Sequence, residues 1–194
     1  MLPEHNFEAL RLELSAKAKN GLDFIGAATL VWAAIAFVWT LPVSVPSKGF
    51  ITFCVGAAVL PLAALLSRVL GTTWKLPHNP LQPLGLWLNF AQLFYFPFLI
   101  FMLMRYPQHF IMTYGIITGA HFFPYAWFYR AWPYACMAGL IPVGCLVLGL
   151  QLSPPDLYLI PAFVAGALLV LGGLLLGSYR RNRQAYLLTS PAGR

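Results

Sequence analysis

The chain has very few charged residues. Asp, Glu, Lys and Arg make up 9% of its 194 residues, whereas hydrophobic residues make up 60%. Soluble domains carry about 25% charged and about 45–50% apolar residues. So few charges cannot cover a soluble surface, so most of the chain must face lipid. The composition excludes a soluble globular protein and predicts an integral membrane protein without a sizeable domain outside the bilayer.

Acidic residues are the scarcest charged class, with five Asp and Glu against twelve Lys and Arg and a formal net charge of +7. The basic residues lie at the ends of apolar runs. That pattern follows from membrane topology and from anionic lipid headgroups. The positive charge therefore does not indicate nucleic-acid binding, and we expect the lipid bilayer to be the main partner.

Clusters of metal-binding residues are also missing. The three cysteines, Cys54, Cys136 and Cys145, form no closely spaced pair, and they are typical of small apolar packing residues. His109 lies twelve positions before His121, so these two histidines do not form a clustered pair of ligands. We predict no metal site and no cofactor.

Catalytic patterns are absent from the sequence. There is no HExxH, no GxSxG, no phosphate-binding loop and no pair of intramembrane carboxylates. A channel would be expected to show rings of charge or a carbonyl filter motif, and neither is evident. We predict no catalytic residue, and an enzyme is the third choice among the functions considered below.

Long apolar runs dominate what is present. Six stretches have about the 17–25 residues that cross a hydrocarbon core of roughly 30 Å. They cover residues 21–41, 50–70, 82–104, 109–129, 134–150 and 157–179. The fold class is therefore all-α, a polytopic membrane protein with six transmembrane helices. Prolines inside three of these runs predict kinks, at Pro61, Pro97 and Pro124.

The segment before the first run predicts a short helix. Phe7, Leu10, Leu14 and Ala18 recur at helical spacing, as in amphipathic helices that lie in the membrane interface. No cleavable signal peptide is visible. We expect three parts: an N-terminal interfacial helix over residues 1–20, a six-helix transmembrane domain over 21–179, and a basic tail over 180–194.

The distribution of Lys and Arg predicts the orientation. With six spans both termini lie on one side, and ten of the twelve basic residues fall there. They are Arg11, Lys17, Lys19, Arg68, Lys75, Arg130, Arg180, Arg181, Arg183 and Arg194, against Lys48 and Arg105 on the other side. The positive-inside rule places both termini in the cytoplasm of a cell whose plasma (inner) membrane holds the protein.

Polar residues inside the fourth run form the candidate site. Tyr114, Thr118, His121 and Tyr125 are spaced by four, three and four, which keeps them on one helical face. An ionisable group at membrane depth is costly and needs a partner or a purpose. Asn89 and Gln92 share a face of the third run, which a tight turn joins to the fourth. We expect a ligand site between these spans, formed by Asn89, Gln92, Thr118, His121 and Tyr125, with Phe122 and Trp127 on its apolar side.

Three functions stay open at this point. The first is a small transporter-like or ligand-binding membrane protein that takes a small molecule or a lipid. The second is a structural or accessory subunit whose polar residues hold helices together. The third is a membrane enzyme acting on a lipid or isoprenoid headgroup. Two GxxxG pairs, Gly115/Gly119 and Gly173/Gly177, predict close helix contacts and could support a homo-oligomer.

Three segments carry a family resemblance: LELSAKAKNGLDFIGAATLVW at 12–32, NPLQPLGLW at 79–87 and TGAHFFPYAWFY at 118–129. They resemble an uncharacterised family of small bacterial integral membrane proteins with six spans. The resemblance covers nearly the whole chain. It implies a bacterial plasma membrane and implies no activity.

Overall fold

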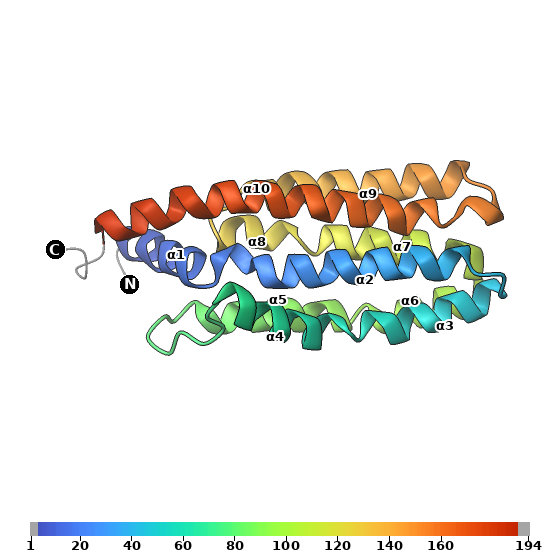
Figure 1. The fold of residues 1–194 in the computed structure, drawn as a ribbon, viewed down its shortest axis with the longest axis horizontal. Helices are drawn as coiled ribbons and strands as arrows, with labels where there is room; N and C mark the ends of the chain where they lie inside the picture. The colour runs from blue at the N-terminus through green and yellow to red at the C-terminus, as the bar shows by residue number, and fades with distance from the viewer. Residues whose placement is uncertain (1–3, 190–194) are drawn as a thin grey trace.

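The computed structural model describes residues 4–189, with side chains from residue 7 onward. Residues 1–3 of the predicted N-terminal segment and residues 190–194 of the predicted tail, Arg194 included, lie outside the described part. Within the described part the fold is helical, with no strand, so the all-α prediction is confirmed. Figure 1 shows the elements as one elongated bundle.

Ten α-helices and two short 3-10 turns make up the described part of the chain. In order they are α1 Glu4–Lys17, η1 Lys19–Gly21, α2 Leu22–Thr40, α3 Val45–Gly56, α4 Val59–Leu70, α5 Gln82–Leu93, α6 Phe96–Arg105, α7 Pro107–Ala120, α8 Phe123–Phe128, α9 Pro133–Gln151, η2 Pro154–Asp156 and α10 Leu159–Thr189.

Five helical segments among the described residues are long and apolar enough to cross a membrane, not the six predicted, and two of the five consist of two consecutive helices each. They are Lys19–Thr40, Val45–Leu70, Gln82–Arg105, Pro133–Gln151 and Pro154–Thr189. The predicted fourth span, 109–129, is not among them. It consists of α7, with 14 residues, and α8, with 6 residues, which a short turn separates in the same way as α3 from α4 and α5 from α6.

Proline explains this division and the two similar ones, between α3 and α4 and between α5 and α6. A proline lies in the first turn of α4, α6 and α8, at Pro61, Pro97 and Pro124 respectively. Proline has no N–H to donate to the preceding turn, but it is tolerated at a helix start. The three predicted kinks are therefore present as breaks between consecutive helices.

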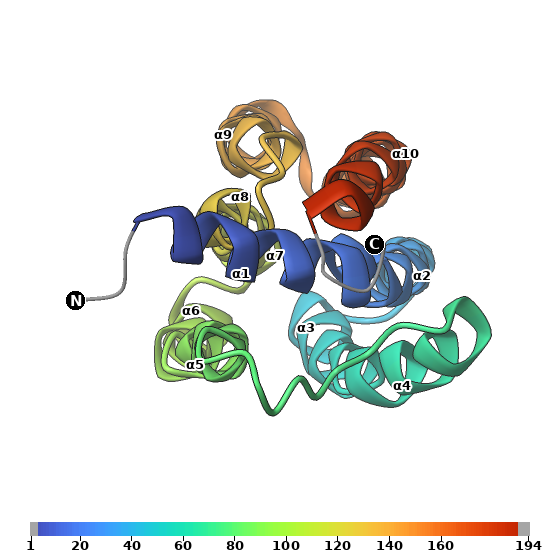
Figure 2. The same ribbon diagram turned by 90° about the vertical axis from the view of Figure 1, so that its left-hand side faces the viewer.

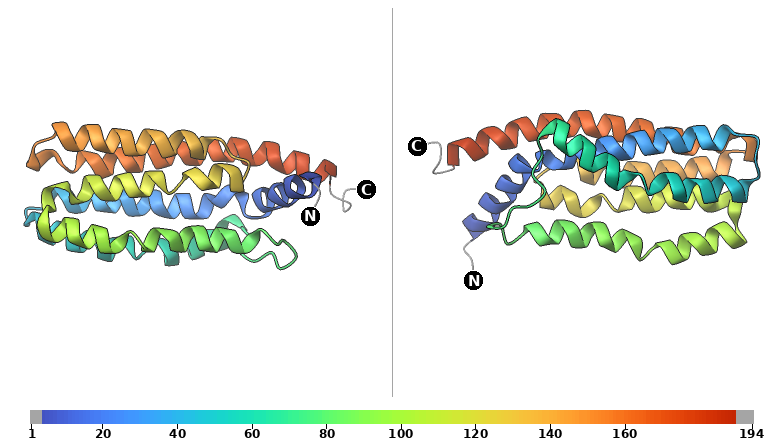
Figure 3. Two further views of the ribbon diagram at one scale, coloured as in Figure 1. Left: turned by 180° about the vertical axis from the view of Figure 1, so that it is seen from behind. Right: turned by 60° about the horizontal axis from the view of Figure 1, so that its bottom comes forward.

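The core lies between α2, α7, α9 and α10. Large side chains with 0–2% exposure fill it, among them Trp39, Ile35, Phe110, Ile141 and Leu171. The pair α5 and α6 lies on the outside of the bundle, as both views in Figure 3 show. No residue of α5 is buried, and in α6 only Leu99 is.

Helix α1 lies across one end of the bundle and packs on α10 and α8 (Figure 2). Leu12, Leu14 and Ser15 are buried there, whereas Phe7 is exposed. Leu14 of the predicted apolar stripe therefore faces protein. The helix itself was predicted correctly, and its position in the membrane interface stays a prediction.

The two glycine pairs have different surroundings. A Cβ added at Gly119 would lie 2.7 Å from the Ile141 Cβ, and one added at Gly115 would lie 2.6 Å from the Cys145 sulfur. Helix α9 thus covers this pair within the chain. A Cβ at Gly173 or Gly177 would meet no atom within 4 Å, so a contact with a second copy through that pair stays a prediction.

Candidate functional site

The break between α7 and α8 is the feature around which the candidate site is built. Pro124 cannot donate a hydrogen bond to the Ala120 carbonyl, so the regular helix ends at Ala120. The Phe122 amide donates to the Gly119 carbonyl at 3.0 Å, and the Tyr125 amide donates to the Phe122 carbonyl at 3.0 Å. His121 is therefore held in a tight turn and not in a helix interior.

His121 and Tyr125 meet across this turn. Their side chains approach at 3.4 Å between His121 Nε2 and the Tyr125 hydroxyl, and their ring centres are 5.3 Å apart. Such a length is at the long end for a hydrogen bond, so the contact is weak. Tyr125 is buried, whereas His121 is half-buried and Phe123 beside it is 66% exposed. The imidazole thus has one weak partner and an open side.

Only part of the predicted site comes together. Phe122 lies beside the His121 ring at 6.3 Å between ring centres, and Thr118 is buried one turn earlier on α7. Asn89 is exposed, and its amide donates to the Gly85 carbonyl of its own helix at 3.0 Å. Gln92 is half-buried. Within the described residues, no hydrogen bond joins Asn89 or Gln92 to the polar groups of α7 and α8.

Trp127 belongs to a different junction, between α8 and α1. The Arg11 guanidinium lies 4.5 Å from the centre of the Trp127 ring, and Arg11 Nε donates to the Trp127 carbonyl at 2.6 Å. Glu8 pairs with both Arg11 and Arg130. Trp127 therefore helps to attach α1 to the bundle and does not line the turn at His121.

A stack of tyrosines continues from Tyr125 toward the end of the bundle that α1 covers. The ring centres are 6.0 Å apart for Tyr125 and Tyr129, and 6.2 Å apart for Tyr129 and Tyr134. The Tyr134 hydroxyl donates to the Asn20 carbonyl at 2.7 Å. Tyr129 lies in the turn after α8.

Asn20 is the centre of a buried polar cluster that was not predicted from the sequence. It has φ 56° and ψ 22°, in the left-handed region that Asn tolerates better than most residues. Its side-chain oxygen accepts from the Ser15 hydroxyl at 2.6 Å, and its amide donates to the Leu175 carbonyl at 3.3 Å. The run Lys19-Asn20-Gly21 before an apolar stretch was the available turn signal.

Asn182 extends this cluster from α10. Its amide donates to the Ser15 hydroxyl at 2.8 Å and to the Tyr129 carbonyl at 3.2 Å. Within the described residues, every buried side-chain nitrogen and oxygen has a hydrogen-bond partner. The cluster therefore joins α1, η1, α9 and α10, and its own polar groups are already satisfied.

Asp23 connects the start of α2 to the link between α4 and α5. Its carboxylate accepts hydrogen bonds of 2.6 Å from the Thr72 hydroxyl and 2.6 Å from the Trp74 indole. The Trp74 ring also stacks on Phe24 at 4.9 Å between ring centres. Asp23 thus does more than favour a helix N-terminus, because it fixes a distant loop.

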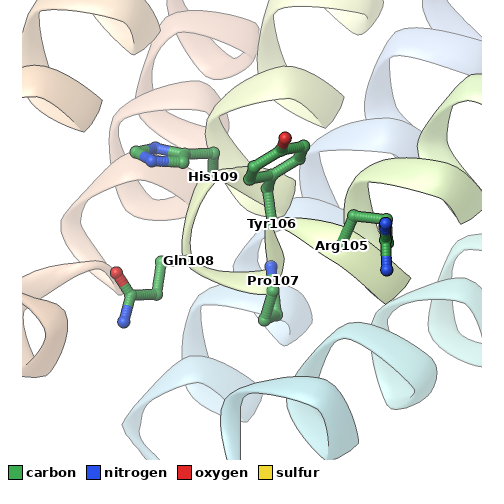
Figure 4. A pocket seen from close by; sticks show the side chains of 5 residues that line it. All are labelled: Arg105, Tyr106, Pro107, Gln108 and His109. Carbon is green, nitrogen blue, oxygen red and sulfur yellow. The ribbon is translucent and has the colours of Figure 1, made fainter.

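An open hollow of about 240 Å³ lies at the turn between α6 and α7, at the end of the bundle away from α1. It is lined by Arg105, Tyr106, Pro107, Gln108 and His109, and Figure 4 shows their side chains pointing in different directions. None of the predicted site residues lines it. No three His, Cys, Asp or Glu side chains of the described residues are grouped to hold a metal ion.

The chain belongs to DUF7010, a family of unknown function, whose match covers residues 7–178. The predicted membership of an uncharacterised family is thereby confirmed. The match brings neither a membrane topology nor a bacterial source. No curated protein and no solved structure matches the chain.

Proposed function

We propose that this member of DUF7010 is a multi-pass membrane protein with six crossings. Five are the helical segments named above, and the additional one, fourth along the chain, is formed by α7 and α8 end to end. Residues 107–128 would span about 33 Å at 1.5 Å per residue, close to the thickness of the hydrocarbon core. The start of the chain at α1 and the end of α10 lie at the same end of the bundle (Figure 1), as an even number of crossings requires.

We infer the orientation from the charges at the two ends. The end that carries α1 also carries Lys17, Lys19 and Arg68, together with the arginines of α10, whereas Lys48 and Arg105 belong to the other end. The positive-inside rule supports a cytoplasmic location for α1 and the end of α10. The bacterial plasma membrane in this proposal is supported by the motif resemblance alone.

The function that we propose is binding of a small amphiphilic ligand at the break between α7 and α8. The single observation behind it is that His121, an ionisable residue on a proposed membrane crossing, has one weak partner and an open side. Broken helices at membrane depth often mark binding sites, and intramembrane histidines usually have a function.

The chemistry of the turn indicates the class of ligand. His121 and Tyr125 offer a donor and an acceptor to one small polar group, while Phe122 and the exposed Phe123 present aromatic surface beside them. A ligand with a small polar headgroup and an apolar body would fit both the polar groups and the aromatic surface. Because Phe123 and Pro124 are exposed, such a ligand would enter sideways from the bilayer.

Native mass spectrometry of the protein in mild detergent tests this proposal. The wild type should carry a discrete small ligand that His121→Ala loses. The matched control is His109→Ala, which removes an exposed histidine at the other end of the bundle and should keep the ligand. Retention by both variants, or the same heterogeneous lipid in all three proteins, would rule out this site.

A structural or accessory role is the second candidate, because every described buried polar side-chain atom is already paired within the chain. In that case His121→Ala would lower the melting temperature in the same way with and without added lipid extract. Asn89→Ala should leave the melting temperature unchanged in either case, since Asn89 is exposed and bonds only within its own helix.

A further inference from the structure

The end of α10 extends beyond the proposed hydrocarbon core. Tyr179 lies twenty residues after Leu159, where α10 begins, which corresponds to about 30 Å of helix. The residues that follow, up to Thr189, are therefore at or beyond the level of the lipid headgroups. Helix α1 packs beside this segment.

Two lysines lie against tyrosines of this segment, and an arginine is on the same face of α10. The Lys19 ammonium lies 5.9 Å from the Tyr179 ring centre, and the Lys17 ammonium lies 5.9 Å from the Tyr186 ring centre. Arg183 lies four residues after Tyr179 and three before Tyr186, so it is on the same face of α10. We call Lys17, Lys19 and Arg183, with the two tyrosines, the cationic notch.

No acidic side chain of residues 7–189 forms an ion pair with a cation of the notch. Among the described residues at this end, Glu8 pairs with Arg11 and Arg130, Glu13 accepts from Asn79, and Asp23 accepts from Thr72 and Trp74. Lys19 donates to the Leu70 carbonyl, which is a neutral partner. Like charges held together without an acid repel each other, unless an anion lies between them.

We propose that the cationic notch binds the headgroup of an anionic phospholipid in the cytoplasmic leaflet. Lysine and arginine donate charge-assisted hydrogen bonds to a phosphate, and tyrosine is common at the level of the headgroups. The inference rests on the proposed membrane crossings but not on the ligand at His121, because the notch lies on different helices.

The experiment compares lipid retention in nanodiscs of phosphatidylcholine with and without phosphatidylglycerol, measured by native mass spectrometry. The wild type should retain phosphatidylglycerol selectively. Each lost cation should weaken this binding about fivefold, so Lys17→Gln with Arg183→Gln should weaken it by roughly 25-fold. Lys17→Arg with Arg183→Lys keeps both charges and should stay near the wild type.

The matched control is Arg68→Gln with Lys75→Gln, which removes two exposed cations at the same end but outside the notch. This variant should bind phosphatidylglycerol like the wild type. If both charge-removing variants lost phosphatidylglycerol binding equally, diffuse surface charge would explain the binding. That result would overturn the proposal of a specific site at the notch. Phosphatidylglycerol in the discs should raise the melting temperature of the wild type. Inorganic phosphate added to phosphatidylcholine discs should leave it unchanged, because the site takes a lipid headgroup. An equal rise with inorganic phosphate would overturn the assignment to a lipid.

The two proposals fail in different ways. A chain that never inserts into nanodiscs would overturn the membrane crossings, and the lipid site with them. A chain that inserts but shows no preference for phosphatidylglycerol would overturn the lipid site alone. Size-exclusion profiles in phosphatidylcholine discs show whether each variant is folded, and Arg183→Gln alone, an exposed change, gives the expected fivefold loss as a second measurement.

Discussion

The hydroxyl of Tyr134, in the first turn of α9, donates a hydrogen bond of 2.7 Å to the backbone carbonyl of Asn20, in the turn before α2. Both residues are buried, with 3% and 0% exposure. The bond joins parts of the chain that are 114 positions apart. It therefore links the polar cluster around Asn20 to the tyrosine stack that leads to His121.

Tyr134→Phe should lower the free energy of unfolding by about 1–3 kcal/mol, because it leaves the buried Asn20 carbonyl without a partner. Chemical unfolding in a mild detergent measures this change. Tyr106→Phe is the control, since Tyr106 is 54% exposed in the turn between α6 and α7 and should change stability little. Equal stability of the two variants would contradict a structural role for the bond.

Asn20→Ala and Asn20→Gly separate the two roles of Asn20. Both lose the bonds to Ser15 and Leu175, but only glycine adopts the left-handed backbone without strain. We expect both to destabilise the protein, and Ala by about 1–2 kcal/mol more than Gly. Thermal unfolding of the two variants side by side gives the difference. The reverse order would show that the backbone conformation carries no strain.

Gly119→Ala should destabilise the bundle by about 1–3 kcal/mol, because the new methyl group would overlap Ile141 on α9. Gly173→Ala is the matched change on α10, where nothing lies within 4 Å, and it should be neutral or stabilise by up to about 1 kcal/mol. Melting temperatures compare the two. A loss at Gly173 equal to that at Gly119 would instead indicate a partner packed on α10.

Asp23→Asn should loosen the link between α4 and α5. Thr72 and Trp74 both donate to the same carboxylate oxygen, and a neutral amide oxygen accepts such bonds more weakly than a charged one. Trypsin should then cut after Lys75 faster than in the wild type, as gel analysis of timed digests would show. Asp156→Asn is the control at the far end, where Asp156 accepts only from Ser153. An unchanged digestion rate for Asp23→Asn would contradict a role of Asp23 in holding the link between α4 and α5.

Cysteine labelling tests whether α7 and α8 together cross the membrane. In a background with Cys54, Cys136 and Cys145 replaced by alanine, Lys75→Cys and Trp132→Cys should resist an impermeant maleimide added to intact cells, whereas Arg105→Cys should react. Trp132 is 56% exposed after α8, so it reports the side on which α8 ends. Reaction of Trp132→Cys together with Arg105→Cys would mean that α7 and α8 do not cross.

Several local features were predictable because they depend on neighbouring residues. Composition and run length indicated helices of membrane-spanning length, and the turn residues at Gly71 and Arg105–Pro107 marked where helices end. Pro124 indicated a kink, since the loss of one N–H is a local effect. The location of a polar residue, His121, beside this kink was also readable, as was its helical spacing from Tyr125.

The rotation and packing of helices could not be predicted in this way. Asn89 and His121 were expected in one ligand site, but Asn89 is exposed on α5, which has no buried residue. Two similar GxxxG pairs differ because α9 covers only Gly115 and Gly119. Which face of an apolar helix meets protein is decided by contacts with distant helices, and in so apolar a chain the hydrophobic pattern gives little contrast between faces.

The sequence by itself determined that this protein is helical, apolar enough to cross a membrane and basic at one end, because these properties are sums over local composition. Only the tertiary structure decided that α7 and α8 are separate helices and that Ser15, Asn20, Tyr134 and Asn182 form one cluster. It also brought Lys17 and Lys19 to the tyrosines of α10. Those contacts join residues far apart in the chain, and their geometry depends on how whole helices pack.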